Sequence, residues 1–249
     1  AIEEIQDLVE TVLMENKHFD IAKAYIIYRA KHETIRDTRK LTLDISSTMD
    51  GYLSQSDWRV NENANVNFSL GGLILHNSGT ITANYWLKNI YPEEVSLAHQ
   101  NADFHIHDLS MFSGYCAGWS LRQLIMEGLG GVPDKITSKP AKHLNTLIQQ
   151  IVNFLGIMQN EWAGAQALSS FDTYLAPFVK IDGLSFKQVK QSIQSFIFGV
   201  NTPSRWGSQA PFTNITLDWN VPGDLESRPA IVGGEDLDFS YGDCQREMD

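Results

Sequence analysis

Residues 142–162 read KHLNTLIQQIVNFLGIMQNEW and form the most regular pattern in the sequence. Their apolar residues recur every three or four positions, which is the spacing of one helical face. A helix over this segment would be about 30 Å long at roughly 1.5 Å per residue. The pattern therefore predicts a long helix for core packing or a subunit interface. Its apolar stripe consists of Leu144, Leu147, Ile148, Ile151, Leu155, Met158 and Trp162.

Ahead of this helix, residues 103–109 show the two-residue period of a strand. Phe104 and Ile106 fall on one face, and His105 and His107 fall on the other. We therefore expect a strand with a polar, histidine-bearing face.

The segments after the long helix change in type. Residues 164–172 are small and polar and predict a loop, whereas residues 185–198 carry apolar residues at helical spacing. Residues 201–204 predict a turn, and residues 212–218 alternate as a strand. Because helices separate the strands, the sequence predicts an α/β fold with parallel strands joined by helical crossovers.

The N-terminal region predicts a small unit ahead of the main domain. Residues 2–13 place apolar side chains on one helical face, and Asp20 is the expected N-cap of a second helix. This second helix is expected to end in the basic stretch from Arg29 to Lys40, since bases suit a helix C-terminus. The Asn-rich segment 61–67 predicts a loop, with an amide-lined polar site as the alternative.

The composition excludes several classes of protein. The chain has 249 residues, a formal net charge of −11 and 43% hydrophobic residues, as in a folded globular protein. No apolar run approaches the roughly 20 residues that span a membrane, and the acidic start lacks the basic region of a signal peptide. The acidic balance argues against binding to nucleic acid. Two cysteines are too few for a disulfide framework or a four-thiolate zinc site, so we expect a cytoplasmic setting.

The residues with the clearest chemical potential lie ahead of the long helix. Cys116 is expected in a tight turn, residues 113–119, between two glycines that let backbone approach a ligand closely. A lone cysteine also fits a small buried hydrophobe. His105 and His107, with Asp108 adjacent, suit a metal site or a polar strand face, and the missing third ligand favours the polar face.

Several short motifs rich in Asn, Gly and aromatic residues follow one another along the chain. They are NENAN at 61–65, HIHDL at 105–109, GYCAGW at 114–119, GAQA at 164–167, SSFD at 169–172, NTPSR at 201–205, PFTNIT at 211–216, GGE at 233–235 and YGD at 241–243. In this order they resemble the anaerobic (class III) ribonucleoside-triphosphate reductases. Residues 1–37 resemble the end of the ATP-cone regulatory domain that precedes the reductase barrel.

This resemblance implies an α/β fold that makes about the first half of a ten-stranded α/β barrel of the glycyl-radical and ribonucleotide reductase type. The strands near 104–109 and 212–218 would belong to this half. Residues 1–37 would be the helical C-terminal remnant of an ATP cone, 38–57 a linker, and 58–249 the N-terminal half of the barrel domain. We expect an N-terminal fragment of a longer enzyme, inactive on its own.

The resemblance also implies radical reduction of ribonucleoside triphosphates to deoxyribonucleoside triphosphates. In the family, a glycyl radical generates a thiyl radical on a finger-loop cysteine, which abstracts the ribose 3′ hydrogen. A second cysteine takes part in reducing the 2′ position. Cys116 matches this second cysteine, and His107 and Asp108 would face the ribose. The thiyl-radical cysteine, the radical glycine and the four-cysteine zinc site have no counterpart in residues 1–249. The glycyl radical and zinc are therefore expected in a missing C-terminal part, and this segment would carry no cofactor.

Partners and effectors follow from the same resemblance. The helix at 142–162 and the segment 164–172 correspond to the dimer interface, where a deoxynucleotide effector sets substrate choice. Ser169, Ser170 and Asp172 are the candidate effector contacts. The expected partners are ribonucleoside triphosphates, ATP and deoxynucleotide effectors, a radical-SAM activating enzyme, formate or a thioredoxin-type reductant, and a second copy of the chain.

Two other functions stay open. One is a nucleotide-sensing regulatory module without chemistry, which would have no reason to contain the segment from His107 to Cys116. The other is a different glycyl-radical enzyme with the same barrel. Cys244 lies in an acidic segment and is expected to be a bystander thiol in either case.

Overall fold

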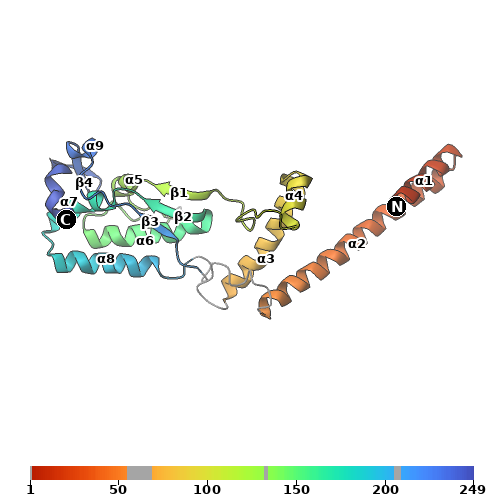
Figure 1. The fold of residues 1–249 in the computed structure, drawn as a ribbon, viewed down its shortest axis with the longest axis horizontal. Coiled ribbons are helices and arrows are strands. Elements are labelled where there is room, and N and C mark those ends of the chain that lie inside the picture. Colours follow the sequence, from red (N-terminus) through yellow and green to blue (C-terminus); the bar gives the residue numbers. More distant parts are fainter. Residues whose placement is uncertain (1, 55–68, 132–133, 205–208) are drawn as a thin grey trace. The chain divides into compact units, whose positions relative to one another are not determined.

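The computed structural model describes residues 2–54, 69–131, 134–204 and 209–249. The chain divides into two compact units, Ala1–Asp57 and Trp58–Asp249 (Figure 1). The loop predicted at residues 61–67 lies outside the described residues.

The first unit consists of two helices, α1 (Ile2–Glu15) and α2 (Phe19–Leu53). The first of these confirms the helix predicted at the N-terminus. Arg29 of α2 makes ion pairs with Asp7 (2.9 Å) and Glu10 (2.5 Å) of α1. These contacts hold the two helices together at their polar faces.

The second helix is longer than the sequence pattern indicated. It begins at Phe19 after an N-cap at His18, so the predicted N-cap Asp20 lies in its first turn. It also continues through the basic stretch and through residues 38–53, which belong to the expected linker. No proline or glycine interrupts the sequence before Gly51, so nothing in the basic stretch ends the helix.

The second unit contains a three-stranded parallel sheet in the order β1–β2–β3. Two helices separate β1 from β2, and two more separate β2 from β3 (Figure 1). The predicted α/β class and the helical crossovers between parallel strands are therefore confirmed. The strands are β1 (Tyr115–Trp119), β2 (Ala163–Leu168) and β3 (Thr213–Ile215), and the helices are α5 (Leu121–Glu127), α6 (Leu144–Glu161), α7 (Phe171–Asp182) and α8 (Phe186–Val200).

Smaller elements lie on either side of this sheet along the chain. A two-stranded antiparallel hairpin turns at Gly233 and Gly234, whose φ angles of +67° and +80° suit a two-residue hairpin turn. The elements before the sheet are α3 (Leu70–Tyr85), the π-helix η2 (Trp86–Ile90) and α4 (Glu93–Gln100); those after it are α9 (Gly223–Glu226), β4 (Pro229–Val232), β5 (Glu235–Ser240), the 3-10 helix η3 (Gly242–Cys244) and α10 (Gln245–Met248).

The centre of the sheet is formed by a segment that we expected to be a loop. Within residues 164–172, the first part belongs to β2 and the last two residues begin α7. Gly and Ala have little strand propensity, but strand formation depends mainly on packing. Gln166 and Leu168 are buried in β2, at 0% and 1% exposure, and the backbone of β2 pairs with a strand on each side.

The strand expected over residues 103–109 does not form. These residues have no ladder partner in the described part of the chain, and β1 begins only at Tyr115. Asp108 has a φ of +54°, in the left-handed region, which interrupts an extended backbone. The alternation of apolar residues and histidines was therefore misleading.

The strand predicted over residues 212–218 is confirmed at its centre, where β3 pairs with β2. It is short because the backbone N–H groups of Asp218 and Trp219 donate to the carboxylate of Asp172 instead of continuing the ladder.

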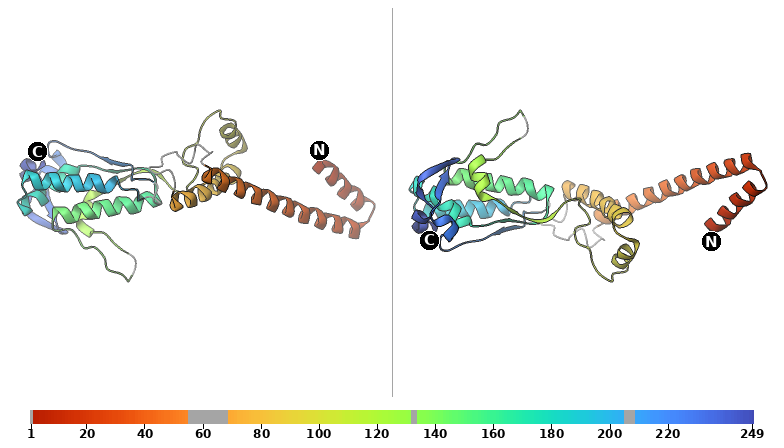
Figure 2. Two further views of the ribbon diagram at one scale, coloured as in Figure 1. Left: turned by 90° about the horizontal axis from the view of Figure 1, so that it is seen from below. Right: turned by 90° about the horizontal axis from the view of Figure 1, so that it is seen from above.

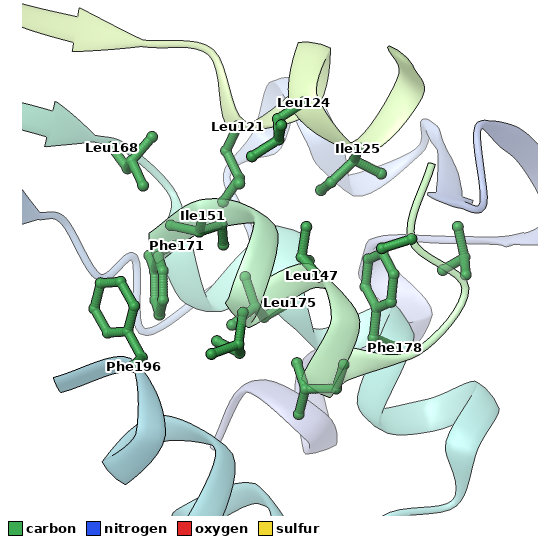
Figure 3. Packing of buried hydrophobic residues seen from close by; sticks show 14 of the residues in the cluster. Leu121, Leu124, Ile125, Leu147, Ile151, Leu168, Phe171, Leu175, Phe178 and Phe196 are labelled. Carbon is green, nitrogen blue, oxygen red and sulfur yellow. The ribbon is translucent and has the colours of Figure 1, made fainter. Parts of the chain in front are cut away.

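The long helix predicted from the sequence is α6, and its apolar stripe lies in the main core (Figure 3). Leu147, Ile151 and Leu155 are fully buried. They belong to the same cluster as Phe178 of α7 and Phe196 of α8. The predicted stripe is thus confirmed as a core-packing surface from Leu144 to Leu155, whereas Met158 and Trp162 are only partly buried and lie outside this cluster.

The second predicted helix is α8, which runs beside α6 (Figure 2). Phe196 of its predicted stripe is buried, but Phe186 and Ile197 are 80% and 50% exposed. Only part of the apolar face of α8 therefore contacts this core.

No helix in the described part of the chain combines the length and apolar character that crossing a membrane requires.

The core assignment predicts a large difference between two apolar truncations. Leu147→Ala is expected to lower the free energy of unfolding by about 2–5 kcal/mol, because it leaves a cavity in a fully buried cluster. Ile136→Ala is the control, with an expected change within about 0.5 kcal/mol, because Ile136 is 98% exposed. Urea denaturation measures both, and equal losses would contradict the core described above.

Candidate functional site

Cys116 lies in strand β1 at an irregularity of the sheet, and not in the tight turn that its neighbouring glycines suggested. Tyr115 pairs with Ala163 and Ala117 pairs with Gln166, so Cys116 alone faces two residues of β2. This is the geometry of a β-bulge, which often redirects a side chain. Cys116 has a φ of +54°, and its side chain is exposed.

The glycine that allows close approach to the sulfur lies on the neighbouring strand. Gly164 of β2 has a φ of +72°, and a Cβ atom there would lie 2.8 Å from Cys116 Sγ. The N–H of Ala165 donates to the same sulfur at 3.3 Å. By contrast, a Cβ on Gly118 would have nothing within 4 Å. Backbone therefore approaches the thiol from β2, as the bulge permits.

Gln166 is a site residue that the sequence did not reveal. Its side chain is 0% exposed, and its Oε1 accepts a hydrogen bond from Trp119 Nε1 at 2.6 Å. Its Nε2 lies 3.5 Å from the carbonyl oxygen of Gly164. In the sequence, the only indication of its role is a glutamine within a run of Ala and Gly. That indication can be used only once residues 163–168 are recognised as a strand.

His107 and Asp108 lie in irregular backbone before β1. The ring of His107 packs edge-on against His105 with 4.9 Å between the ring centroids. His99 accepts the backbone N–H of Ile106 at its Nδ1, at 3.1 Å. No hydrogen bond, ion pair or ring contact among the described residues joins His107 or Asp108 to Cys116, so their substrate roles stay predictions. No group of three or more His, Cys, Asp or Glu among the described residues could hold a metal ion.

Asp172 has a structural task at the start of α7. Its carboxylate accepts the backbone N–H groups of Asp218 and Trp219, at 2.9–3.1 Å, and that of Thr173 at 3.0 Å. Thr173 in turn donates its hydroxyl to Asp218 Oδ2 at 2.6 Å. Asp172 therefore ties the first turn of α7 to the chain that leaves β3.

The other two candidate effector residues lie at the same end of β2. Ser170 has a φ of +53° and donates its backbone N–H to Thr216 Oγ1 at 3.0 Å, and Ser169 is exposed. Both follow Leu168, the last residue of β2, whereas Cys116 faces Gly164 near its beginning. The structure thus places the thiol and these hydroxyls at opposite ends of one strand, and effector binding stays a prediction.

A groove of about 930 Å³ lies between α6 and α8. Its lining includes the amides Gln149, Asn153, Gln191 and Gln194, together with the exposed ring of Phe198. Neutral amides can donate and accept hydrogen bonds without the desolvation cost of a charge. The groove belongs to the helix pair whose first member was expected at a subunit interface.

Cys244 differs from Cys116 in every relevant respect. It is fully buried in η3, and its thiol donates to the carbonyl oxygen of Ser240 at 3.6 Å. Burial raises the pKa of the Cys244 thiol from 9.0 to about 11, with a smaller opposing effect of Lys180. This thiol stays neutral near physiological pH and has no access to a ligand, as a bystander would.

Two family models match the chain. The model described as "Anaerobic ribonucleoside-triphosphate reductase" matches residues 62–249. The model of the ATP cone domain matches residues 1–34.

Curated relatives with the same description extend beyond the matched part. The anaerobic ribonucleoside-triphosphate reductase of Haemophilus influenzae is 24% identical over 256 residues, which cover 91% of this chain and 35% of that protein. The Escherichia coli protein of the same name is 25% identical over 259 residues, with the same coverage of 91% and 35%. The chain therefore spans about a third of the length of these relatives.

Solved structures show the same fold. The anaerobic ribonucleotide reductase of Thermotoga maritima with citrate in the active site aligns with a TM-score of 0.62 at 21% identity, over 83% of this chain and 39% of that one. Its complex with dATP and CTP gives 0.58 at 23% identity, over 86% and 40%. The α/β sheet and its helices are therefore part of the reductase barrel fold, as predicted.

The contact between Gly164 and Cys116 predicts an energetic coupling between the two positions. Gly164→Ala and Gly183→Ala both place a Cβ at a left-handed φ, and only the first meets a neighbour within 4 Å. We expect Gly164→Ala to destabilise the chain by about 1 kcal/mol less when Cys116 is also replaced by alanine, because the clash with Sγ is then absent. The matched Gly183→Ala penalty is expected to be the same in both backgrounds.

Urea denaturation of the wild type, the three single variants and the two double variants measures this coupling. A Gly164→Ala penalty that ignores residue 116 would show that the sulfur is not held against Gly164.

The two thiols are expected to differ in reactivity. At pH 8, iodoacetamide should label exposed Cys116 well before buried Cys244, as followed by peptide mass spectrometry. Equal labelling of both cysteines at pH 8 would contradict the burial of Cys244.

The pKa of Cys244 is higher in the folded chain than in the unfolded chain, so its neutral thiol favours folding below pH 9. This contribution is lost as the pH rises through 9 to about 11. Cys244→Ala should remove that part of the alkaline destabilisation.

Proposed function

The chain belongs to the family of anaerobic ribonucleoside-triphosphate reductases, and on that premise we propose that its protein reduces ribonucleoside triphosphates to deoxyribonucleoside triphosphates by radical chemistry. The observation that carries this proposal is the exposed thiol of Cys116, set in a β-bulge with a backbone N–H directed at its sulfur. A structural cysteine is ordinarily buried and needs no such arrangement.

Cys116 is proposed to act on the 2′ position of the ribose. A neutral thiol can donate a hydrogen atom or a proton to a substrate radical, and a thiolate can act as a reductant. The exposed Sγ is free to meet a ligand, while Gly164 and Ala165 hold its other side. The family's glycyl radical supplies the one-electron activation of the ribose. Because the relatives extend well beyond the matched part, we propose that this radical and the zinc site lie outside residues 1–249.

We also assign His107 and Asp108 to the ribose hydroxyls. Both side chains are exposed in the segment that leads into β1, so neither is committed to the core. An imidazole and a carboxylate can together donate to and accept from a hydroxyl. The net charge of −11 repels a triphosphate, so the anion must be held by local donors rather than by the overall field.

Regulation is proposed to involve a second copy of the chain. Ile157 of α6 and Ile197 and Phe198 of α8 expose 53%, 50% and 76% of their surface, which suits an interface between two copies. Ser169 and Ser170 are proposed to contact a deoxynucleotide effector, with Asp172 holding the backbone beside them.

The N-terminal unit is proposed to bring in a second level of control. We assign residues 1–37 to the end of an ATP cone that responds to ATP and dATP, and the helical residues 38–53 to its connection with the reductase domain. The remaining partners are proposed to be a radical-SAM activating enzyme and either formate or a thioredoxin-type protein, in the cytoplasm.

The decisive test is Cys116→Ala in the full-length protein, activated anaerobically and assayed for deoxynucleotide formation. We expect turnover to fall by at least about a thousandfold, because a group that takes part in the chemistry is lost. Cys244→Ala is the matched control, and it should retain turnover within about twofold. Near-wild-type turnover of Cys116→Ala would reject the role assigned to Cys116. No turnover in the activated wild-type protein would instead favour a nucleotide-sensing module, which the ATP-cone match would also fit.

A further inference from the structure

We propose that Gln166 is a positioning residue for the Cys116 thiol and that it acts through the peptide group between Gly164 and Ala165. The inference rests on the proposed role of Cys116 in the reduction. It concerns how the sulfur is aimed, which the family match does not address.

One peptide group connects the two side chains. Its carbonyl oxygen, that of Gly164, lies 3.5 Å from Gln166 Nε2, and its N–H, that of Ala165, donates to Cys116 Sγ at 3.3 Å. A trans peptide is planar, and its C=O and N–H point in opposite directions. Whatever fixes the carbonyl therefore also fixes the direction of the N–H and, with it, the preferred position of the sulfur.

The amide of Gln166 is held in one orientation. The indole N–H of Trp119 can only donate, so the oxygen of the amide must face it at 2.6 Å, which leaves Nε2 for the Gly164 carbonyl. The indole is itself packed between Phe154 and Trp162, with centroid distances of 5.5 and 5.9 Å. Because Gln166 is fully buried, water does not compete for its amide.

The peptide group between Gly164 and Ala165 needs this restraint because it lies in the bulge. Regular pairing of β1 and β2 stops at Tyr115 and resumes at Ala117, so the peptide after Gly164 is not fixed by a regular ladder. Gly164 itself has a left-handed φ and no side chain to restrict it. A buried side-chain amide supplies the restraint that the interrupted ladder does not.

The consequence for the reaction is geometric. A catalytic group that is misplaced by about 1 Å can cost about a hundredfold in rate. Substrate binding depends on other contacts, so loss of the restraint should affect the chemical step and leave binding nearly unchanged. A residue with only a structural task would not produce that separation.

Gln166→Met tests this in the full-length enzyme, with CTP as substrate and anaerobic activation. We expect kcat to fall about tenfold or more while KM stays within about twofold. Gln150→Met is the matched control, because Gln150 is also a buried glutamine, 3% exposed, whose Nε2 donates to Ser138 and Lys139. It lies about three turns before the end of α6, and its kcat should remain within about twofold of the wild type.

Trp119→Phe provides a second variant that keeps an aromatic ring and removes the indole N–H that orients Gln166, together with part of the ring volume. We expect a smaller fall in kcat, about threefold, again without a matching change in KM. This variant keeps the proposal falsifiable if Gln166→Met does not fold.

Cys116→Ala, measured beside these variants, distinguishes the proposed role of Cys116 from the positioning role of Gln166. If it is inactive while Gln166→Met and Trp119→Phe behave as the wild type, the positioning role is wrong and the reductase assignment stands. A change confined to KM would also overturn the positioning role. If Cys116→Ala retains turnover, the role assigned to Cys116 and the positioning role of Gln166 both fall, while the reductase assignment stands.

Discussion

The second unit depends on the parallel pairing of β2 with a strand on each side. Its backbone bonds to β1 and to β3, and α6 and α7 attach directly to its two ends along the chain. Most of its side chains are small, at Ala163, Gly164, Ala165 and Ala167, and its two large residues, Gln166 and Leu168, are buried. The core helices and the thiol are both arranged around this strand.

The same strand separates the chain's candidate functions. At its beginning, the irregular pairing with β1 brings the Gly164 and Ala165 backbone against the sulfur of Cys116. At its end, the Asp172 carboxylate gathers backbone N–H groups from the segment after β3 and fixes how α7 begins. The strand therefore separates the thiol from the proposed effector residues by its own length.

The sequence predicted those parts of the structure in which burial follows a simple period. The stripes of α6 and α8 were visible because one face of each helix meets the core. Phe186 and Ile197 are exceptions, because both are exposed although Phe196 of the same helix is buried. Residues 103–109 alternate in polarity, but they find no neighbouring strand, and period alone cannot supply one. Residues 163–168 show the opposite error, because a loop was predicted where a strand forms. Their strand structure comes from pairing with two neighbouring strands rather than from their own propensity. Gln166 was missed for the same reason, whereas Cys116 was found through the motif that surrounds it.

The backbone conformation of Cys116 also has a consequence for stability. At a φ of +54°, the local conformation favours glycine, and a residue with a Cβ is frustrated there. The neighbouring Gly164 also has a positive φ, but it has no Cβ to strain it. With the role proposed for Cys116, its strained backbone is a stability cost that the chain bears at the site of the chemistry.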